Sequence, residues 1–394
     1  MKVSPTLLGG RTPEAFLKEY WQKKPLLIRG AFPGIVAPVT PEDLAGLACE
    51  EEVEARLVLE KGGAYPWEVR YGPFDVEDFE DLPPKHWTLL VQEVDRHVAA
   101  VAELRDHFRF LPNWRIDDVM VSYAPEGGGV GAHVDNYDVF LVQAKGRRRW
   151  RIHHTPVEEE ILVPDLDVRI LADFEPDAEW VLEPGDMLYL PPRIPHDGVA
   201  LDDCLTCSVG FRAPSHVELV TGFLEDCLVT LDPTVRYADP ADLTPPAHPG
   251  EITPEARAAV REVLRSLVRD DAALDAWFGR FITTPKRGEG IVYEEGGDDE
   301  EGAVFSPEGL ISALRQGARL RRTALSELAF LPDRGDEATL FAAGVAYPMR
   351  LERARLITGT EPLTAATLGS HLEDPRFTEV LAALVAAGAL AVES

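Results

Sequence analysis

The sequence is poor in cysteine, in basic residues and in long apolar runs. Four cysteines in 394 residues argue against a disulfide-stapled scaffold. Lys and Arg total 39 against 68 Asp and Glu, a formal net charge of −29 that disfavours nucleic-acid backbone and anionic lipid as partners. No apolar run approaches the roughly 18 residues of a membrane span. Residues 1–5 contain no signal-peptide core, so we expect a cytoplasmic protein.

Two of the four cysteines, Cys204 and Cys207, stand three residues apart. This spacing occurs in zinc and redox sites, but no second Cys pair completes such a site here. Residues 203–211 have the pattern of a strand, on which residues three apart point to opposite faces. We therefore expect two buried thiols.

The length and the apolar fraction predict a folded protein of two or three domains. At 45% hydrophobic residues, the chain can bury real cores. The acidic balance has two interpretations: it keeps the protein soluble, or it attracts a basic partner such as a basic protein substrate.

Four helix starts share one pattern, at Thr12, Thr40, Thr253 and Ser306. Each offers an N-cap hydroxyl, followed by proline at the first helical position and an acid in the first turn. The sequences that follow them differ, so these are helix signals and not internal repeats.

Residues 115–212 read as short strands separated by glycine, proline and acidic clusters, which is typical of a β-sandwich or barrel. The predicted strands are 119–123, 139–142, 149–152, 187–190 and 206–209. We assign residues 1–214 to this domain, with a helical elaboration at its N-terminal end.

The rest of the chain is predicted to be mainly helical and to end in a small separate domain. In segment 215–287 a single apolar stripe predicts an amphipathic helix that packs on the β-domain or on a second copy, and we favour a homodimer. The stripe consists of Val260, Val263, Leu264, Leu267 and Val268.

Residues 288–304 form an acidic, glycine-rich linker.

Residues 305–394 predict a winged-helix-like module: a helix after Ser306, strands at 323–331 and 339–347, and helices from Leu363 and Thr378. The module holds nine arginines, no lysine and eleven acids, a net charge of −2. A DNA-reading module should be basic. We therefore expect a structural or protein-contact role, without sequence-specific DNA binding.

His133 and Asp135, with a distant His196, match the two-histidine, one-carboxylate ligand set of non-haem Fe(II). Residues two apart on a strand leave the same face. An isolated His-x-Asp pair is more often a surface pair than a metal site. However, residues 183–196 resemble the second motif of the cupin superfamily, and Gly127 followed by His133-x-Asp135 resembles the first. That superfamily often has glycine where this chain has Arg193.

In the largest enzyme class that uses this ligand set, 2-oxoglutarate is the cosubstrate. Its far carboxylate needs a buried cation, and segment 146–152 supplies one candidate. Trp150 and Ile152 set the inward face of a strand, and Arg148 shares that face. The neighbouring arginines, Arg147, Arg149 and Arg151, should point outward. The alternative interpretation, a solvated basic edge strand, explains these three arginines but not Arg148. Arg148 is therefore the predicted carboxylate clamp, with bidentate geometry available.

Six segments together resemble the JmjC-type bacterial ribosomal oxygenases of the cupin superfamily, and the resemblance extends over essentially the whole chain. It implies a double-stranded β-helix with N-terminal helices, a helical dimerisation segment and a C-terminal winged helix. It also implies Fe(II), 2-oxoglutarate and O2, a homodimer, and hydroxylation at the β-carbon of an arginyl residue in a basic large-subunit ribosomal protein. The segments are 111–118, 127–135, 137–140, 146–150, 183–196 and 208–214.

An arginyl substrate needs an acceptor for its guanidinium, and we predict Asp118 at the start of a strand. Tyr137 should share the inward face of the ligands, and Ser208 could accept a further hydrogen bond. The alternative role of Asp118 is a helix or strand cap, with Asp117 or Asp138 as the acceptor instead.

Two other functions stay open. One is a JmjC-type hydroxylase or demethylase of histidine or lysine. The other is a non-catalytic cupin ligand sensor joined to a winged helix, which the near-neutral charge of the C-terminal module disfavours.

Overall fold

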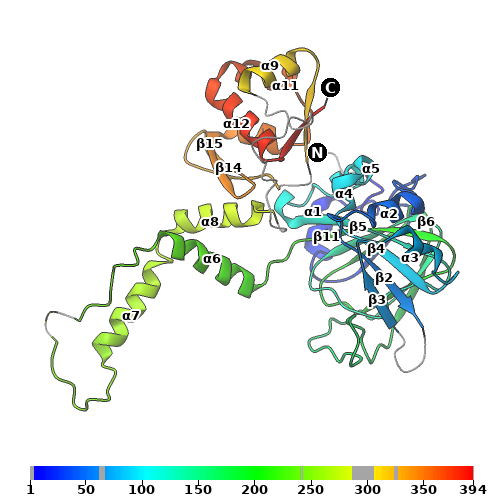
Figure 1. Ribbon diagram of the computed structural model, residues 1–394, viewed down its shortest axis with the longest axis horizontal. Coiled ribbons are helices and arrows are strands. Elements are labelled where there is room, and N and C mark those ends of the chain that lie inside the picture. The colour runs from blue at the N-terminus through cyan, green and yellow to red at the C-terminus, as the bar shows by residue number, and fades with distance from the viewer. Residues whose placement is uncertain are drawn as a thin grey trace. The chain divides into compact units, whose positions relative to one another are not determined.

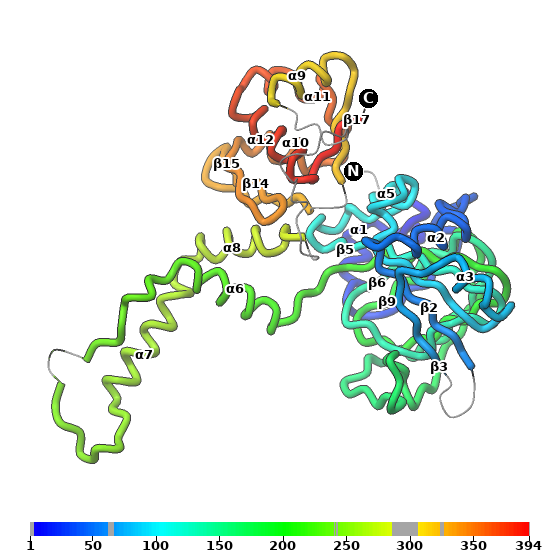
Figure 2. The backbone as a smooth tube through the Cα atoms, viewed as in Figure 1, coloured from blue at the N-terminus to red at the C-terminus, as the bar shows by residue number. Residues whose placement is uncertain are grey.

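The computed structural model describes residues 4–61, 67–239, 241, 243–285, 306–323 and 327–393, and the chain divides into units 1–213 and 214–394. Among the helices of these residues, none combines the length and the apolar character that a membrane span requires. The predicted linker at 288–304 lies outside the described residues. The elements of each unit can be followed along the chain in Figures 1 and 2.

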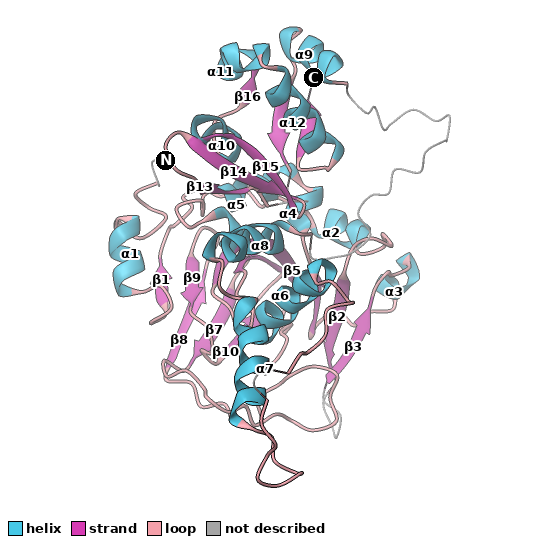
Figure 3. Cartoon of the chain, turned by 90° about the vertical axis from the view of Figure 1, so that its left-hand side faces the viewer, coloured by secondary structure: helices cyan, strands magenta, loops and turns pink. Residues whose placement is uncertain are grey.

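The first unit is built from two antiparallel sheets. The larger has the order β1-β9-β6-β11-β5-β4-β2-β3 and the smaller β10-β7-β8, both visible in Figure 3. The strands are β1 (Leu26–Ile28), β2 (Ala55–Glu60), β3 (Trp67–Tyr71), β4 (Trp87–Val91), β5 (Ile116–Ala124), β6 (Val139–Lys145), β7 (Arg148–Ile152), β8 (Ala178–Leu182), β9 (Met187–Leu190), β10 (His196–Ala200) and β11 (Cys204–Phe211).

Alternation along the strands divides the apolar residues between two cores. On β6, Phe140 and Val142 belong to the large core outside the sheet, whereas Val139 and Leu141 face the smaller sheet. Helices contribute to the large core and cover that outer face (Figure 1): α1 (Pro13–Glu19), α2 (Pro41–Leu47), α4 (Val94–His97) and α5 (Ala99–Asp106). The inner face is left to line a cavity between the sheets.

The predicted strands of residues 115–212 are all present, but the N-terminal elaboration is not only helical. Besides helices, which include α3 (Val76–Glu80), it contributes β1 to β4 to the large sheet. Both Cys204 and Cys207 are buried on β11, in different apolar clusters, as a strand requires. The three-residue spacing therefore builds no joint thiol site.

The second unit begins with three helices, α6 (His216–Thr230), α7 (Pro254–Ser266) and α8 (Asp271–Thr283). Trp277 on α8 packs against Phe223 on α6, with ring centroids 5.3 Å apart. The predicted stripe on α7 is largely exposed, and so are apolar side chains of α6 such as Val220 and Leu228. These helices therefore keep an apolar surface that no described residue covers.

The C-terminal module combines helices with two small sheets around its own core, β16-β12-β17 and β13-β14-β15. Its elements are α9 (Pro307–Arg315), β12 (Arg319–Arg322), β13 (Ala329–Pro332), β14 (Glu337–Ala342), β15 (Val345–Arg350), α10 (Leu351–Thr358), β16 (Leu363–Thr364), α11 (Ala365–Leu368), α12 (Pro375–Ala386) and β17 (Leu390–Glu393).

Two expectations for this module need correction. The stretch 339–347, predicted as one strand, is a hairpin that turns through Ala343 and Gly344, both at positive φ. Helix α10 was not predicted. The predicted strand 323–331 lies partly outside the described residues, and β13 begins at Ala329.

All four predicted helix starts are N-caps in the structure. The side-chain oxygens of Thr12, Thr40, Thr253 and Ser306 each accept a backbone N–H three residues later, and proline follows each of them. Each cap satisfies a backbone donor that would otherwise lack a partner.

Candidate metal centre and cosubstrate pocket

His133, Asp135 and His196 converge at one end of the cavity between the two sheets. Their candidate ligand atoms all lie within 4.8 Å of one another. Oδ1 of Asp135 lies 4.0 Å from Nε2 of His133, and Oδ2 of Asp135 lies 3.6 Å from Nε2 of His196. In the part of the chain that the structure describes, no other group of three or more His, Cys, Asp or Glu gathers so closely.

Backbone carbonyls hold both imidazoles with Nε2 directed to the centre. Nδ1 of His133 lies 2.9 Å from the carbonyl oxygen of Gly131, and Nδ1 of His196 lies 2.9 Å from that of Ile194. A donor role for each Nδ1 leaves each Nε2 as a lone-pair ligand, which is the usual outer support of a metal-bound histidine.

Electrostatics also favours neutral, metal-binding imidazole. Burial, with His133 nearby, lowers the pKa of His196 to about 4. The ring is therefore unprotonated at neutral pH, and a cation need not displace a proton from it. Two imidazoles and one carboxylate on one side of an open cavity fit an Fe(II)-type ion.

The strand predicted to carry His133 and Asp135 is not there. His133 forms a single antiparallel bridge with His196, and Asp135 lies in the loop before β6. The two side chains converge because backbone hydrogen bonds fix the loop: the His133 and His196 peptides exchange two bonds of 3.0 and 2.9 Å.

Arg148 lies where alternation predicted it, on the inward face of β7 and buried. It lines the same cavity of about 460 Å³ as the three candidate ligands. Its Nε and Nη2 atoms are buried and have no hydrogen-bond partner among the described residues. A buried guanidinium without a counter-charge is costly, so this side of the cavity is built to receive an anion.

The other arginines of this segment face outward, as predicted. Arg147 pairs with Asp202 at 2.9 Å, and Arg151 pairs with Asp197 at 2.5 Å. Arg149 is half-buried on β7, the central strand of the small sheet, with its Nε atom 4.0 Å from the Glu179 carboxylate. These partners leave Arg148 as the cation of β7 that lines the cavity.

Asp118 lines the cavity and also holds the backbone. Its Oδ2 accepts the N–H of Glu93, the N-cap residue of α4, at 2.9 Å. Both the predicted cavity position and the alternative cap are therefore present. Burial, with the Asp117 carboxylate nearby, raises the pKa of Asp118 to about 7.

The raised pKa of Asp118 gives a stability prediction for Asp118→Asn. The folded state binds this proton more tightly than the unfolded chain, so the wild-type protein loses stability as pH rises from about 4 to 7. Asparagine keeps an acceptor for Glu93 and carries no charge. We expect equal melting temperatures near pH 4 and a more stable variant, by a few kcal/mol, at pH 8. Melting curves across this range test it, and a constant difference at all pH values would contradict it.

Tyr137 and Ser208 also line the cavity. Tyr137 lies in the Asp135 loop and not on a strand, with 42% of its surface exposed. Burial of its hydroxyl end, beside the Asp135 carboxylate, raises the Tyr137 pKa. Ser208 is buried on β11, as predicted.

The two fallback carboxylates differ in position. Asp117 lines the cavity. Asp138 is fully buried elsewhere and accepts hydrogen bonds from Tyr189 at 2.6 Å, Gln22 at 3.1 Å and Arg115 at 3.2 Å. Asp138 is thus committed to the fold.

Other histidines do not join the centre. His153 and His154 follow β7, which ends at Ile152, and both lie near Asp177, at 3.6 and 2.8 Å. They are partly or fully exposed. This pair supplies a natural control for the candidate ligand set.

Sequence reasoning missed part of the cavity wall. Arg56, Thr88 and Gln92 come from the N-terminal strands or the turn after them, and segment 167–169 comes from the long β7–β8 connection. The apolar runs of β2 and β4 were the available signal for the strands. Nothing in segment 167–169 indicates that it returns to the centre.

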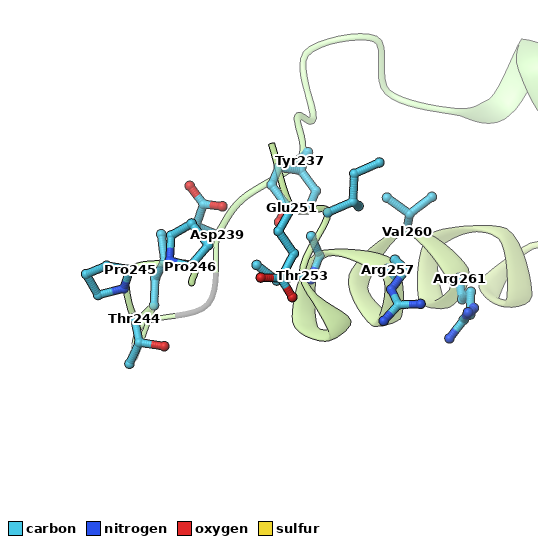
Figure 4. Close-up of a pocket in the computed structure, with 13 residues that line it drawn as sticks. Tyr237, Asp239, Thr244, Pro245, Pro246, Glu251, Thr253, Arg257, Val260 and Arg261 are labelled. Atoms are coloured by element: carbon cyan, nitrogen blue, oxygen red, sulfur yellow. Dashed lines mark hydrogen bonds between the residues drawn. The ribbon is translucent and has the colours of Figure 1, made fainter. Parts of the chain in front are cut away.

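A second hollow lies along the connection from α6 to α7 and belongs to the second unit (Figure 4). Tyr237, Pro245, Pro246 and Arg257 are among its lining residues. It contains none of the candidate metal ligands. The chemistry of the site therefore rests on the cavity of the first unit.

Two domain families match the chain. Residues 103–219 match the JmjC domain and residues 260–391 the ROXA-like winged helix. The ribosomal protein uL16 3-hydroxylase of Escherichia coli is 39% identical over 95% of this chain and 95% of its own length. The chain belongs to the JmjC-type ribosomal oxygenases.

Further relatives extend this ribosomal oxygenase assignment. A probable ribosomal oxygenase of Haemophilus influenzae is 37% identical over 79% of each chain. The E. coli ribosomal oxygenase YcfD, solved with cobalt and 2-oxoglutarate, superposes with a TM-score of 0.81 at 37% identity, covering 97% of this chain and 98% of that one. The predicted fold and the predicted oxygenase class are confirmed.

Proposed function

We propose that this ribosomal oxygenase is an Fe(II)- and 2-oxoglutarate-dependent dioxygenase that hydroxylates the β-carbon of an arginyl residue in a uL16-type ribosomal protein. The observation that carries the proposal is a single cavity that combines the His133, Asp135 and His196 centre with the Arg148 guanidinium, whose buried Nε and Nη2 atoms have no hydrogen-bond partner among the described residues. The E. coli relative, which is named for uL16 3-hydroxylation, supplies the substrate class.

The three ligands would hold the iron from one side and leave its other positions facing the cavity. With O2 and 2-oxoglutarate, bound Fe(II) supplies the oxidant for an unactivated C–H bond, while the cosubstrate becomes succinate and CO2. Arg148 would bind the far carboxylate of 2-oxoglutarate with charge-assisted hydrogen bonds. This places the anion against a cation that lacks a described protein partner.

The opposite wall would receive the substrate side chain. Asp118 would accept the guanidinium, whose positive charge stabilises the carboxylate form and offsets the burial that raises its pKa. Tyr137 and Ser208 would border the same side chain. Their contribution is to set which carbon lies next to the iron and to exclude water, since positioning governs the rate of such a reaction.

The charge of the chain and its exposed apolar surface support proposals for its partner, its location and its assembly. The acidic chain, with a net charge of −29, would speed encounter with a basic ribosomal protein in the cytoplasm. A second copy would cover the exposed apolar side chains of α6 and α7, giving a homodimer. The near-neutral C-terminal module would contact protein and not DNA.

The test is incubation of the protein with Fe(II), 2-oxoglutarate, air and a recombinant uL16-type protein, followed by peptide mass mapping. We expect one added oxygen atom on one arginine. Absence of a modified arginine, with metal bound, would reject the proposed substrate.

Asp118→Ala separates arginine from other targets. A cationic guanidinium needs the carboxylate, so this variant should lose about tenfold to a hundredfold or more in kcat/KM, as expected for a charged hydrogen bond. A neutral histidine substrate would leave activity nearly intact, and that result would favour the histidine hydroxylase alternative.

A further inference from the structure

Arg193 occupies an unusual place in the turn before β10. Its backbone φ is +69°, a left-handed conformation that favours glycine and that few long side chains adopt. A residue held there against its preference is kept by its contacts. Those contacts lead directly to the metal centre.

The backbone of Arg193 joins two separate loops. Its N–H donates to the carbonyl oxygen of Asp135 at 2.7 Å, so the turn holds the peptide of a metal ligand. Its own carbonyl oxygen accepts the N–H of Val157 at 2.9 Å. Val157 lies near the start of the β7–β8 connection, whose residues 156–172 we call the flap segment.

The guanidinium of Arg193 repeats this connection with its side chain. Nε donates to the carbonyl oxygen of Val157 at 2.9 Å, and Nη2 donates to that of Glu158 at 3.2 Å. Nη1 donates to Oδ1 of Asn136 at 3.0 Å and also pairs with the Glu160 carboxylate. One side chain therefore bonds the residue next to a ligand and three residues of the flap segment.

The flap segment reaches the centre at its other end as well. The N–H of Leu171 donates to the carbonyl oxygen of Ala132 at 2.8 Å, beside the ligand His133. Asp167, Val168 and Arg169 line the cavity. The segment is thus a wall of the site, tied to both turns that carry ligands.

We propose that Arg193 is a positioning residue that holds the Asp135 loop and the flap segment in one fixed arrangement around the metal. This inference rests on the proposed function for its catalytic meaning. The left-handed turn directs the Asp135 peptide, and the guanidinium locks the flap segment against it. A fixed carboxylate and a fixed wall keep the reacting carbon in register and keep water out.

Arg193→Gly tests this role because glycine suits the positive φ and should not weaken the turn itself. We expect an unchanged or higher melting temperature, a roughly tenfold to hundredfold weaker Co(II) affinity, as for other outer supports of metal ligands, and faster amide hydrogen exchange in residues 157–172. With 2-oxoglutarate but no protein substrate, the variant should also consume more cosubstrate than the wild type.

Two further variants sharpen the outcome. Arg193→Lys keeps the charge but loses the fork of donors, so it should restore only part of the Co(II) affinity. Arg147→Ala removes an exposed arginine that pairs with Asp202 at 2.9 Å outside the cavity, so its Co(II) affinity should match that of the wild type.

Unchanged Co(II) affinity and unchanged exchange in Arg193→Gly would overturn the inference. Neither measurement needs the protein substrate. If the wild-type protein modifies no ribosomal protein, the proposed function fails while the Arg193 result can still be judged.

Discussion

His196→Ala should abolish hydroxylation and lower metal affinity by more than a hundredfold. The imidazole is one of three candidate ligands, and losing a ligand should exceed the tenfold to hundredfold loss seen when its outer partner is removed. Co(II) titration followed by visible absorption measures the affinity, and peptide mass mapping measures turnover.

Two variants protect this His196 experiment from a folding artefact. His133→Ala removes a more exposed ring, with a side chain 24% exposed, and should give the same loss with less effect on the fold. His153→Ala removes a partly exposed imidazole outside the centre and should leave both measurements unchanged. Full metal affinity in both ligand variants would place the metal elsewhere.

Arg148→Met should weaken the binding of 2-oxoglutarate and stabilise the protein that lacks this cosubstrate. Loss of a buried charge pair costs about 2–5 kcal/mol, which corresponds to a roughly thirtyfold to several-thousandfold weaker affinity for 2-oxoglutarate. Without cosubstrate, however, the buried Nε and Nη2 atoms have no described partner. An apolar side chain of similar length should therefore stabilise the cosubstrate-free protein by about 1–3 kcal/mol.

Calorimetric titration of 2-oxoglutarate and thermal melting without it provide the two readouts for Arg148→Met. Arg147→Met is the matched control, since Arg147 is exposed and paired with Asp202. It should change neither quantity appreciably. Unaltered 2-oxoglutarate affinity in Arg148→Met would show that another group holds the far carboxylate.

Most of the sequence predictions that agree with the structure follow from the alternation of side chains along strands. It placed Arg148 inward on β7, Arg147 and Arg151 outward, and the two cysteines of β11 on opposite faces. A period of two is a local property of a buried strand, so the sequence alone can show it. Helix caps are equally local, which explains why all four predicted starts are present.

The features that sequence reasoning missed depend on contacts between distant segments. The loop of His133 and Asp135 is shaped by hydrogen bonds to His196 and Arg193, and no local pattern encodes them. The strands β2 to β4 gain their place because β4 pairs with β5, and β2 and then β3 extend the sheet to its edge. Tertiary pairing of this kind overrides local preference.

The bridge between His133 and His196 links metal binding to the stability of this end of the two-sheet domain. These two residues are candidate ligands, and their backbones also exchange two hydrogen bonds of 3.0 and 2.9 Å. Coordination of one ion by both side chains would further link the two segments that these hydrogen bonds join. Metal occupancy and the pairing of these two segments would then be thermodynamically linked, so a chelator would loosen the site that it empties.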